Sequence, residues 1–181
     1  MSRKPVFREV DALDLLTRDH DAIKRLFKDY ERLLMRPADN ERKAEIVGKI
    51  CFALSLHAQI EDEIFYPAVR AAISPDKLTH HALRGHGRSK ELIARLDEME
   101  PGDAGYDHAV ALLAACATLY MDEERQALFP QVRQSRLDTL ALGVQLVQRQ
   151  KALHQDVTRL GLPPSKTAAP SWPTPCRVVM A

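Results

Sequence analysis

Two short segments of this chain carry side chains that bind metal ions, at a spacing that brings them together on a helix. In the first, His57 stands four residues before Glu61; in the second, Tyr120 stands four residues before Glu124. Side chains four residues apart lie one turn apart on the same face of a helix. An imidazole and a carboxylate in this arrangement form a metal-ligand pair, or half of one. The second segment keeps the carboxylate but has a phenol in place of the imidazole.

The two segments belong to a pattern that the chain repeats once. The second copy follows the first at a distance of 63 residues, and the two copies end in Pro67 and Pro130. Upstream, His20 and His86 stand at the same place in two further matching stretches, 66 residues apart. A repeat of this length that occurs only twice favours a pseudo-symmetric bundle over a solenoid. We therefore expect two helical hairpins, each with one histidine on its first helix and one donor-plus-glutamate pair on its second.

The apolar residues recur at three- and four-residue steps, which is typical of helices with one buried face. Loop signals rich in proline and glycine separate these helices. The expected fold is all-α: an up-down-up-down four-helix bundle over residues 10–135, a shorter fifth helix over 136–160 and a disordered, proline-rich tail over 161–181. The four helices of the bundle are expected at residues 11–35, 41–73, 75–99 and 106–134.

All six candidate ligands fall on the inward, apolar faces of the four bundle helices: His20, His57, Glu61, His86, Tyr120 and Glu124. A single histidine on such a face is more often an ordinary core residue. Two buried glutamates among three histidines would be costly without a compensating cation. A pair of metal ions in the bundle core, bridged by the carboxylates, satisfies the whole set. Mixed imidazole and carboxylate donors suit iron or manganese, whereas zinc would not need two carboxylate bridges.

The remaining histidines and the cysteines give weaker signals. His80, His81 and His108 are expected to be solvated or peripheral, and so is His154 unless the fifth helix packs back on the bundle. The three cysteines form no paired pattern, which predicts thiols and not disulfides: Cys51, Cys116 and Cys176.

Composition excludes several classes of function. The 181 residues are 45% hydrophobic and 28% charged, as in a soluble globular domain, and the formal net charge is +1. Such a balance gives no electrostatic footprint for nucleic acid or a membrane surface. No apolar stretch is long enough to span a bilayer, and the start of the chain has no apolar signal core. We therefore expect a cytoplasmic protein, monomeric or weakly homodimeric, whose partner is a small molecule.

The spacing of these residues resembles the hemerythrin-like (HHE cation-binding) family over residues 10–135. The resemblance rests on the histidines and glutamates of the repeat and on the Phe-Tyr-Pro and Leu-Phe-Pro sequences that follow the two glutamates. It implies a four-helix bundle with a non-haem di-iron centre, in which oxo or carboxylate groups bridge two iron ions; manganese is the less favoured metal. Members of the family bind O₂ reversibly, sense it, or handle hydrogen peroxide, nitric oxide or iron.

The chain departs from the family pattern at two positions. Tyr120 stands where most relatives have a histidine, and Gly85 stands where most have a glutamate. A phenolate bound to iron would add a negative charge, stabilise the ferric state and disfavour reversible O₂ carriage. The alternative is that Tyr120 only packs in the core or hydrogen-bonds to one of the glutamates. The glycines on both sides of His86, Gly85 and Gly87, mark either a close backbone approach or a local break in the helix.

Three functions remain open from the residues and the resemblance. The first is a di-iron oxidoreductase that reacts with hydrogen peroxide, as a catalase does, or with nitric oxide. The second is an O₂-binding, O₂-sensing or iron-binding module without turnover. The third is a metal-free bundle that serves as an interaction module. The phenol at position 120 favours the first.

Overall fold

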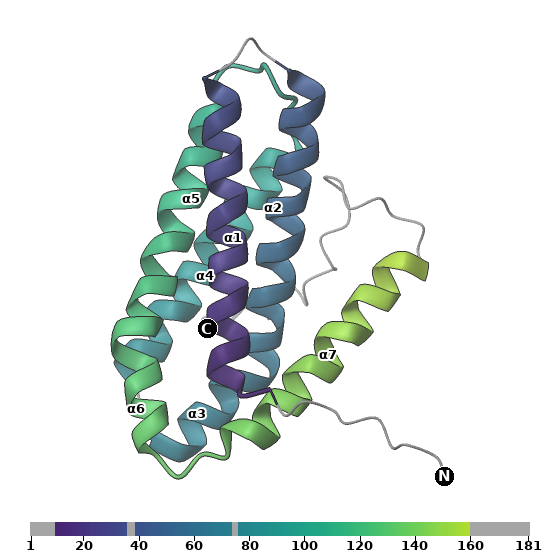
Figure 1. Ribbon diagram of the computed structural model, residues 1–181. Helices are drawn as coiled ribbons and strands as arrows, with labels where there is room; N and C mark the ends of the chain where they lie inside the picture. The colour runs from purple at the N-terminus through teal and green to yellow at the C-terminus, as the bar shows by residue number, and fades with distance from the viewer. Residues whose placement is uncertain (1–9, 36–38, 74–75, 160–181) are drawn as a thin grey trace, which may run out of the picture.

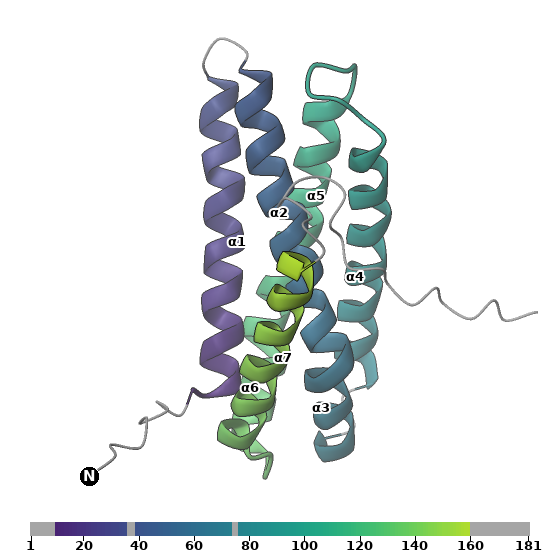
Figure 2. The same cartoon turned by 90° about the vertical axis from the view of Figure 1, so that its right-hand side faces the viewer.

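The protein is a bundle of long helices with one further helix laid across it (Figures 1 and 2). The computed structural model describes residues 10–35, 39–73 and 76–159, and the side chains of all of these except 76–83 and 157–159. Within these ranges every regular element is a helix, which confirms the predicted all-α fold. The elements are α1 (Ala12–Leu34), α2 (Asn40–Ile60), η1 (Glu61–Phe65), α3 (Tyr66–Ile73), α4 (Asp76–Asp97), α5 (Tyr106–Glu123), η2 (Glu124–Leu128), α6 (Phe129–Gln134) and α7 (Thr139–Arg159).

Two antiparallel hairpins form the bundle. The first pairs α1 with the long helix made by α2, η1 and α3, and the second pairs α4 with the long helix made by α5, η2 and α6. The most extensive packing lies within the hairpins, between α1 and α2 and between α4 and α5. Figure 2 shows the four long helices side by side. This is the up-down-up-down arrangement that the repeat predicts.

The core of the bundle consists of two apolar clusters with a polar layer between them. Along α1, His20 lies between Leu16 of one cluster and Ile23 of the other. Along the fourth long helix, Glu124 stands between Met121 and Leu128, which again belong to different clusters. The polar layer is therefore enclosed by apolar side chains toward both ends of the bundle, where a low dielectric strengthens every charge interaction.

The sequence predicts continuous helices over 41–73 and 106–134, but the structure has one turn of π-helix in each. In η1 the N–H of Tyr66 donates to the carbonyl of Glu61, five residues back, and in η2 the N–H of Phe129 donates to the carbonyl of Glu124. The residue that follows each turn is a proline, Pro67 or Pro130. A proline ring presses on the carbonyl four residues earlier, and the wider π turn accommodates it. Each π turn begins at one of the two predicted glutamate ligands.

The fifth helix, α7, packs against α1, α2 and η1 (Figure 1). Gly143 permits the approach, since a Cβ at this position would lie 1.8 Å from the backbone oxygen of Val10. Farther along, Nε of Arg149 lies 2.6 Å from Oε2 of Glu63. The predicted tail, residues 161–181, lies outside the described residues. Of the helices in the described residues, none combines the length and the apolar character that crossing a membrane requires.

Candidate metal centre

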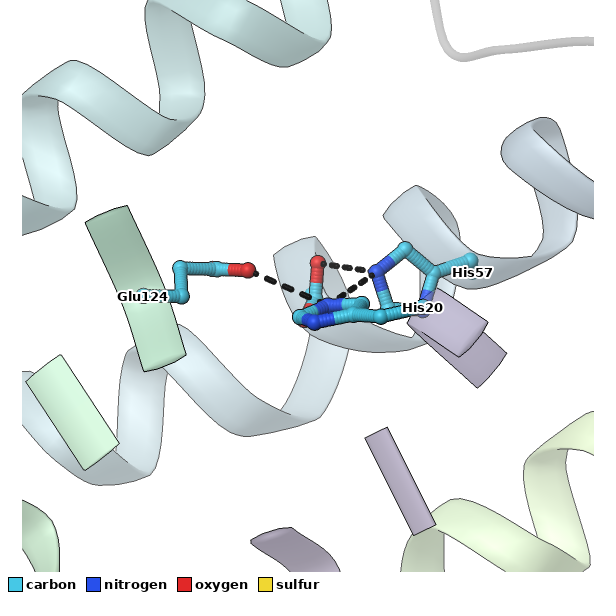
Figure 3. Close-up of side chains that lie close together, drawn as sticks. His20, His57 and Glu124 are labelled. Carbon is cyan, nitrogen blue, oxygen red and sulfur yellow. Dashed lines mark hydrogen bonds and ion pairs between the residues drawn. The ribbon is translucent and has the colours of Figure 1, made fainter. Parts of the chain in front are cut away.

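Four buried side chains converge in the polar layer of the bundle. His20 comes from α1 and His57 from α2, while Glu61 and Glu124 are the first residues of the two π turns. One donor atom from each lies within 4.8 Å of the donor atoms of the other three. Figure 3 shows the imidazole of His20 between the carboxylate of Glu124 and the imidazole of His57. The structure thus brings together four of the six predicted ligands.

The donor atoms of this group are spaced like neighbouring ligands of one ion. Nε2 of His20 lies 3.1 Å from Nε2 of His57 and 3.3 Å from Oε2 of Glu124. Nε2 of His57 lies 3.2 Å from Oε2 of Glu61. Nitrogen and oxygen ligands bound at about 2.1 Å lie about 3 Å apart when they are adjacent on the ion. The spacing therefore fits a metal ion.

His86 on α4 reaches Glu61 from the other hairpin. Its Nε2 lies 3.2 Å from Oε2 of Glu61, and its Nδ1 lies 2.9 Å from Oδ1 of Asp62. Lys90, one turn further along α4, contacts the second oxygen of Asp62 at 3.2 Å. A carboxylate on the far nitrogen is the usual way in which a metal-binding histidine is oriented. Sequence analysis missed Asp62 and Lys90, although the position of Lys90, four residues after His86, was a usable signal.

The carboxylates set the charge state of the imidazoles in the absence of metal. Burial disfavours the charged form of His86, but Asp62 and Glu61 outweigh it and raise the pKa of His86 to about 9. Burial also opposes the charge on His57, yet Glu61 and Asp19 prevail and raise its pKa. Burial raises the pKa of Glu61, but His57 and His86 more than offset this and hold it below its ordinary value. Protons on the imidazoles thus balance the buried carboxylate, and a cation could take their place.

Tyr120 fills a space that a glycine leaves open. Its ring lies edge-on to that of His86, with 5.0 Å between the ring centroids. A Cβ on Gly85 would lie 2.8 Å from Cδ1 of Tyr120. Since α4 continues unbroken through Gly85, this glycine marks a close approach and not a break. Gly85 and Tyr120 therefore form one close-packed arrangement.

The hydroxyl of Tyr120 is buried and makes no hydrogen bond to Glu61 or Glu124, and Ser89 of α4 is the polar side chain beside it. The structure therefore does not contain the predicted alternative in which Tyr120 hydrogen-bonds to Glu61 or Glu124. Burial and the charges of these two glutamates raise the pKa of Tyr120 well above its ordinary value. In the absence of a cation the phenol keeps its proton.

In the described part of the chain, Glu61 Oε1, His86 Nε2, Tyr120 Oη and Glu124 Oε2 are buried and have no hydrogen-bond partner, whereas His20 and His57 turn Nε2 toward the layer and leave Nδ1 unpaired. Native proteins leave few such atoms unpaired, because each costs about 1–3 kcal/mol. Their concentration in one layer indicates that a partner other than the protein belongs there. A cation suits the carboxylate oxygens and the lone pair of an imidazole nitrogen.

Comparison with known proteins identifies the family of this chain. Residues 11–132 match the hemerythrin HHE cation binding domain. The chain belongs to this family. The matched region of the HHE domain covers all six residues of the polar layer that the sequence singled out.

The HHE domain is similar to several known proteins. An uncharacterized protein of Mycobacterium tuberculosis, Rv2633c, is 25% identical over 121 residues, which are 67% of this chain and 71% of the relative. A DNA nickase of Nostoc sp. is 24% identical over 126 residues, 70% of this chain, but the chain spans only 34% of the nickase. The crystal structure of an HHE cation binding domain-containing protein from Mycobacterium kansasii, an Rv2633c homolog, has a TM-score of 0.68 at 20% identity, covering 88% of this chain and 99% of that one. This last likeness supports the fold.

Tyr66 is a further residue of the polar layer that sequence analysis missed. Its hydroxyl donates a hydrogen bond to Oε1 of Glu124 and lies 3.5 Å from Oε2 of Glu61. The equivalent residue in the second copy of the repeat is Phe129, whose ring stacks on His20 with 5.8 Å between centroids. The π turn is one residue wider than an α-helical turn, and this change of register brings Tyr66 to the buried face. The Phe-Tyr-Pro sequence was the only signal.

The other histidines of the chain give no donor to the polar layer where the structure describes them. His108 is exposed on α5, as predicted. Because α7 packs back on the bundle, His154 lies edge-on against Phe52 of α2, with 5.2 Å between ring centroids, but it does not reach the polar layer. The side chains of His80 and His81 lie outside the described part.

Proposed function

We propose that the HHE domain holds two iron ions in its polar layer and reacts with hydrogen peroxide, or with nitric oxide, in oxidant defence. The observation that carries the proposal is that the buried donor atoms of His20, His57, Glu61 and Glu124 lie within 4.8 Å of one another. Two buried carboxylates among three buried imidazoles form a donor set that suits iron first and manganese second.

The layout of the layer favours two ions over one. The imidazoles of His20 and His57 meet at one side of the glutamates, while His86 and Tyr120 pack together at another. Oε2 of Glu61 contacts a histidine of each pair, His57 and His86, at 3.2 Å in both cases. Glu61 would therefore be a ligand that two ions share, with His20 and His57 holding one ion and His86 and Tyr120 holding the other.

The phenol of Tyr120 is the reason to prefer peroxide to O₂. Burial and the two carboxylates keep it protonated in the metal-free layer, so a cation at its Oη is what would favour the phenolate. A phenolate in place of a neutral imidazole adds a negative charge, which favours ferric over ferrous iron, whereas reversible O₂ carriage needs a lasting diferrous state. Bound iron would supply the redox chemistry that turns two molecules of hydrogen peroxide into one of O₂ and two of water.

The residues around the ligands hold them in place. The Tyr66 hydroxyl donates a hydrogen bond to Glu124 and fixes the position of that carboxylate. Asp62 holds Nδ1 of His86 and thereby turns Nε2 toward Glu61. The apolar clusters toward both ends of the bundle keep water from the layer.

Metal analysis and a visible spectrum test the ligand assignment. Protein purified from iron-supplied cells is expected to hold two iron ions per chain, and its ferric form is expected to show a broad visible charge-transfer band. The band is expected to vanish in Tyr120→Phe and to persist in Tyr66→Phe, which loses one hydroxyl from the same layer. An unchanged spectrum in Tyr120→Phe would rule out phenolate ligation.

Release of O₂ from hydrogen peroxide tests the reaction. Glu61→Ala and Glu124→Ala are expected to lose both iron and activity, whereas His108→Ala, at an exposed position, is expected to retain both. A reversible O₂ adduct of the reduced protein with little turnover would favour the alternative of an O₂-binding or iron-binding module. Freshly purified protein without metal would favour the interaction bundle.

We further propose that the chain acts on small molecules in the cytoplasm, as a monomer or weak homodimer, and binds neither nucleic acid nor membranes. The formal net charge of +1 supports the choice of a small-molecule partner. Cys51 and Cys116 are not joined in a disulfide, which suits a reducing compartment. Light scattering of the purified protein would test the oligomeric state.

A further inference from the structure

Three surface clefts lie between the long helices, and they differ in what they reach. The cleft between α1 and α5 has a volume of about 610 Å³, and the one between α1, α2 and α7 about 180 Å³. Neither is lined by any of the six residues of the proposed metal centre. The cleft between α4 and α5, of about 590 Å³, is lined by Tyr120. Of these three clefts, only the third touches the centre.

Two glycines of α4 line this cleft and leave space where side chains would otherwise lie. Gly85 and Gly87 both line it, together with Cys116 and Leu119 of α5. A Cβ at position 87 would meet no atom within 4 Å, so the space beside Gly87 is open. Sγ of Cys116 lies 3.7 Å from the carbonyl oxygen of Gly85, so α4 and α5 are in direct contact beside the cleft. The cleft is thus hollowed out where α4 lacks side chains.

The Tyr120 side chain connects the cleft with the carboxylates. Its Cβ, Cγ and Cδ1 atoms are the nearest neighbours of a Cβ placed on Gly85, at the cleft. Its ring lies on His86, and the charges of Glu61 and Glu124 act on its hydroxyl. That hydroxyl is buried and donates no hydrogen bond to either glutamate, and the Ser89 hydroxyl lies beside it. A small molecule with a lone pair that entered past the ring would meet these two hydroxyls.

Two further faces of the layer are closed by ion pairs and hydrogen bonds. Between α1 and α5, Lys24 Nζ contacts Asp122 Oδ1 at 2.5 Å. One turn toward η2, Arg125 bonds Asp21 at 2.7 Å across the same face. On the α7 side, Gln150 donates to Asp19, and the small cleft ends against these side chains.

We propose that the α4–α5 cleft is the entrance through which a small uncharged molecule reaches the polar layer, and that the Tyr120 ring is the last barrier it passes. Two arginines and two glutamates border the cleft, so its formal charges cancel and it does not select an ion: Arg84, Arg88, Glu91 and Glu123. Hydrogen peroxide, nitric oxide and O₂ belong to the class of molecule that it admits. The reaction at the inner end rests on the proposed function, whereas the route rests on the geometry of the cleft alone.

Dissolved O₂ is a paramagnetic probe that tests the route without any reaction. NMR relaxation is measured on the full chain supplied with zinc, which is diamagnetic, with and without O₂ under pressure. The matched internal control is Tyr106, which is buried on the same helix at 1% exposure, compared with 2% for Tyr120, and does not line the cleft. The O₂-induced relaxation at Gly85 and at the Tyr120 ring is expected to exceed that at Tyr106 several-fold. Equal relaxation at the two tyrosines would overturn the proposal.

A large side chain introduced at the cleft by substitution provides the second test. Gly87→Trp places a large ring where the structure has open space, and Leu112→Trp places one at a half-exposed position of α5 that does not line the cleft. In Gly87→Trp the O₂ effect at Tyr120 is expected to disappear, and nitric oxide is expected to change the spectrum of the iron-loaded protein about ten-fold more slowly. Leu112→Trp is expected to match the unmodified chain in both measurements.

The two tests separate the entrance from the proposed function. A protein that binds no iron in any variant would contradict the proposed function, while the O₂ measurement still decides whether the cleft is the route. An iron-loaded Gly87→Trp that reacts with nitric oxide at the original rate, together with an undiminished O₂ effect at Tyr120, would show that small molecules enter elsewhere.

Discussion

Tyr66 donates a hydrogen bond from its hydroxyl to Glu124, and so ties the first half of the repeat to the second within the polar layer. The acceptor is 2% exposed, so water does not replace a lost donor. Tyr66→Phe is therefore expected to lower the free energy of unfolding of the metal-free protein by about 1–3 kcal/mol, measured by urea denaturation. In a Glu124→Gln background the loss is expected to be smaller, since the charged acceptor is gone. Strictly additive losses would show that the charge of the acceptor adds nothing to the bond.

The two glycines that flank His86 should respond in opposite ways to the same substitution. Alanine is favoured over glycine inside a helix by about 0.5–1 kcal/mol, and a Cβ at Gly87 meets open space, so Gly87→Ala is expected to stabilise by that amount. Gly85→Ala is expected to destabilise by about 1–3 kcal/mol, because its Cβ would lie 2.8 Å from the Tyr120 ring. Thermal unfolding measures both. In a Tyr120→Ala background Gly85→Ala should become stabilising, and equal effects at both glycines would contradict the close approach.

The stability of the metal-free protein should fall as the pH rises through the weakly alkaline range. The pKa of His86 is raised from 6.5 to about 9 by Asp62 and Glu61 against the effect of burial. A group with a raised pKa stabilises the fold in its protonated form, fully below about pH 6.5 and no longer above about pH 9. The unfolding temperature is therefore expected to drop by several degrees between these values. Calorimetry checks this, and a drop of the same size in His86→Gln would assign it to another group.

The attachment of α7 depends on one position without a side chain. A Cβ on Gly143 would lie 1.8 Å from the carbonyl oxygen of Val10, and a backbone atom cannot turn aside as a side chain can. Gly143→Ala is expected to loosen α7 from α1, which hydrogen exchange would report as lost protection in α7 while α4 and α5 keep theirs. The neighbouring Val144 is 45% exposed, so Val144→Ala is the matched control and is expected to have no effect. Unchanged protection in Gly143→Ala would mean that α7 can shift without detaching.

The positions of the helices and of the candidate metal ligands on them can be predicted from the sequence because both recur periodically. The first helix, predicted over 11–35, is Ala12–Leu34, since its apolar stripe and the capping aspartate before it set both ends closely. His20 and His57 were identified because each interrupts an apolar stripe at a repeated position. The structure brings their nitrogens to 3.1 Å from each other, a detail of packing between helices that spacing along the chain does not contain.

The π turns, and the residues whose positions depend on them, could not be predicted from the periodicity of the sequence. A stripe of apolar residues does not reveal which carbonyl each N–H bonds, so a one-residue change of register inside a helix leaves little trace beyond the proline after it. Tyr66 was missed for this reason, because regular α-helical spacing from Glu61 does not point it inward. Asp62 was missed because its role depends on α4, which belongs to the other hairpin.

The shared space of Gly85 and Tyr120 makes the two positions interdependent. A Cβ on Gly85 would crowd the Cβ, Cγ and Cδ1 atoms of Tyr120, so a side chain at position 85 requires a smaller or displaced residue at position 120. A substitution at either position can therefore be interpreted only together with the residue at the other.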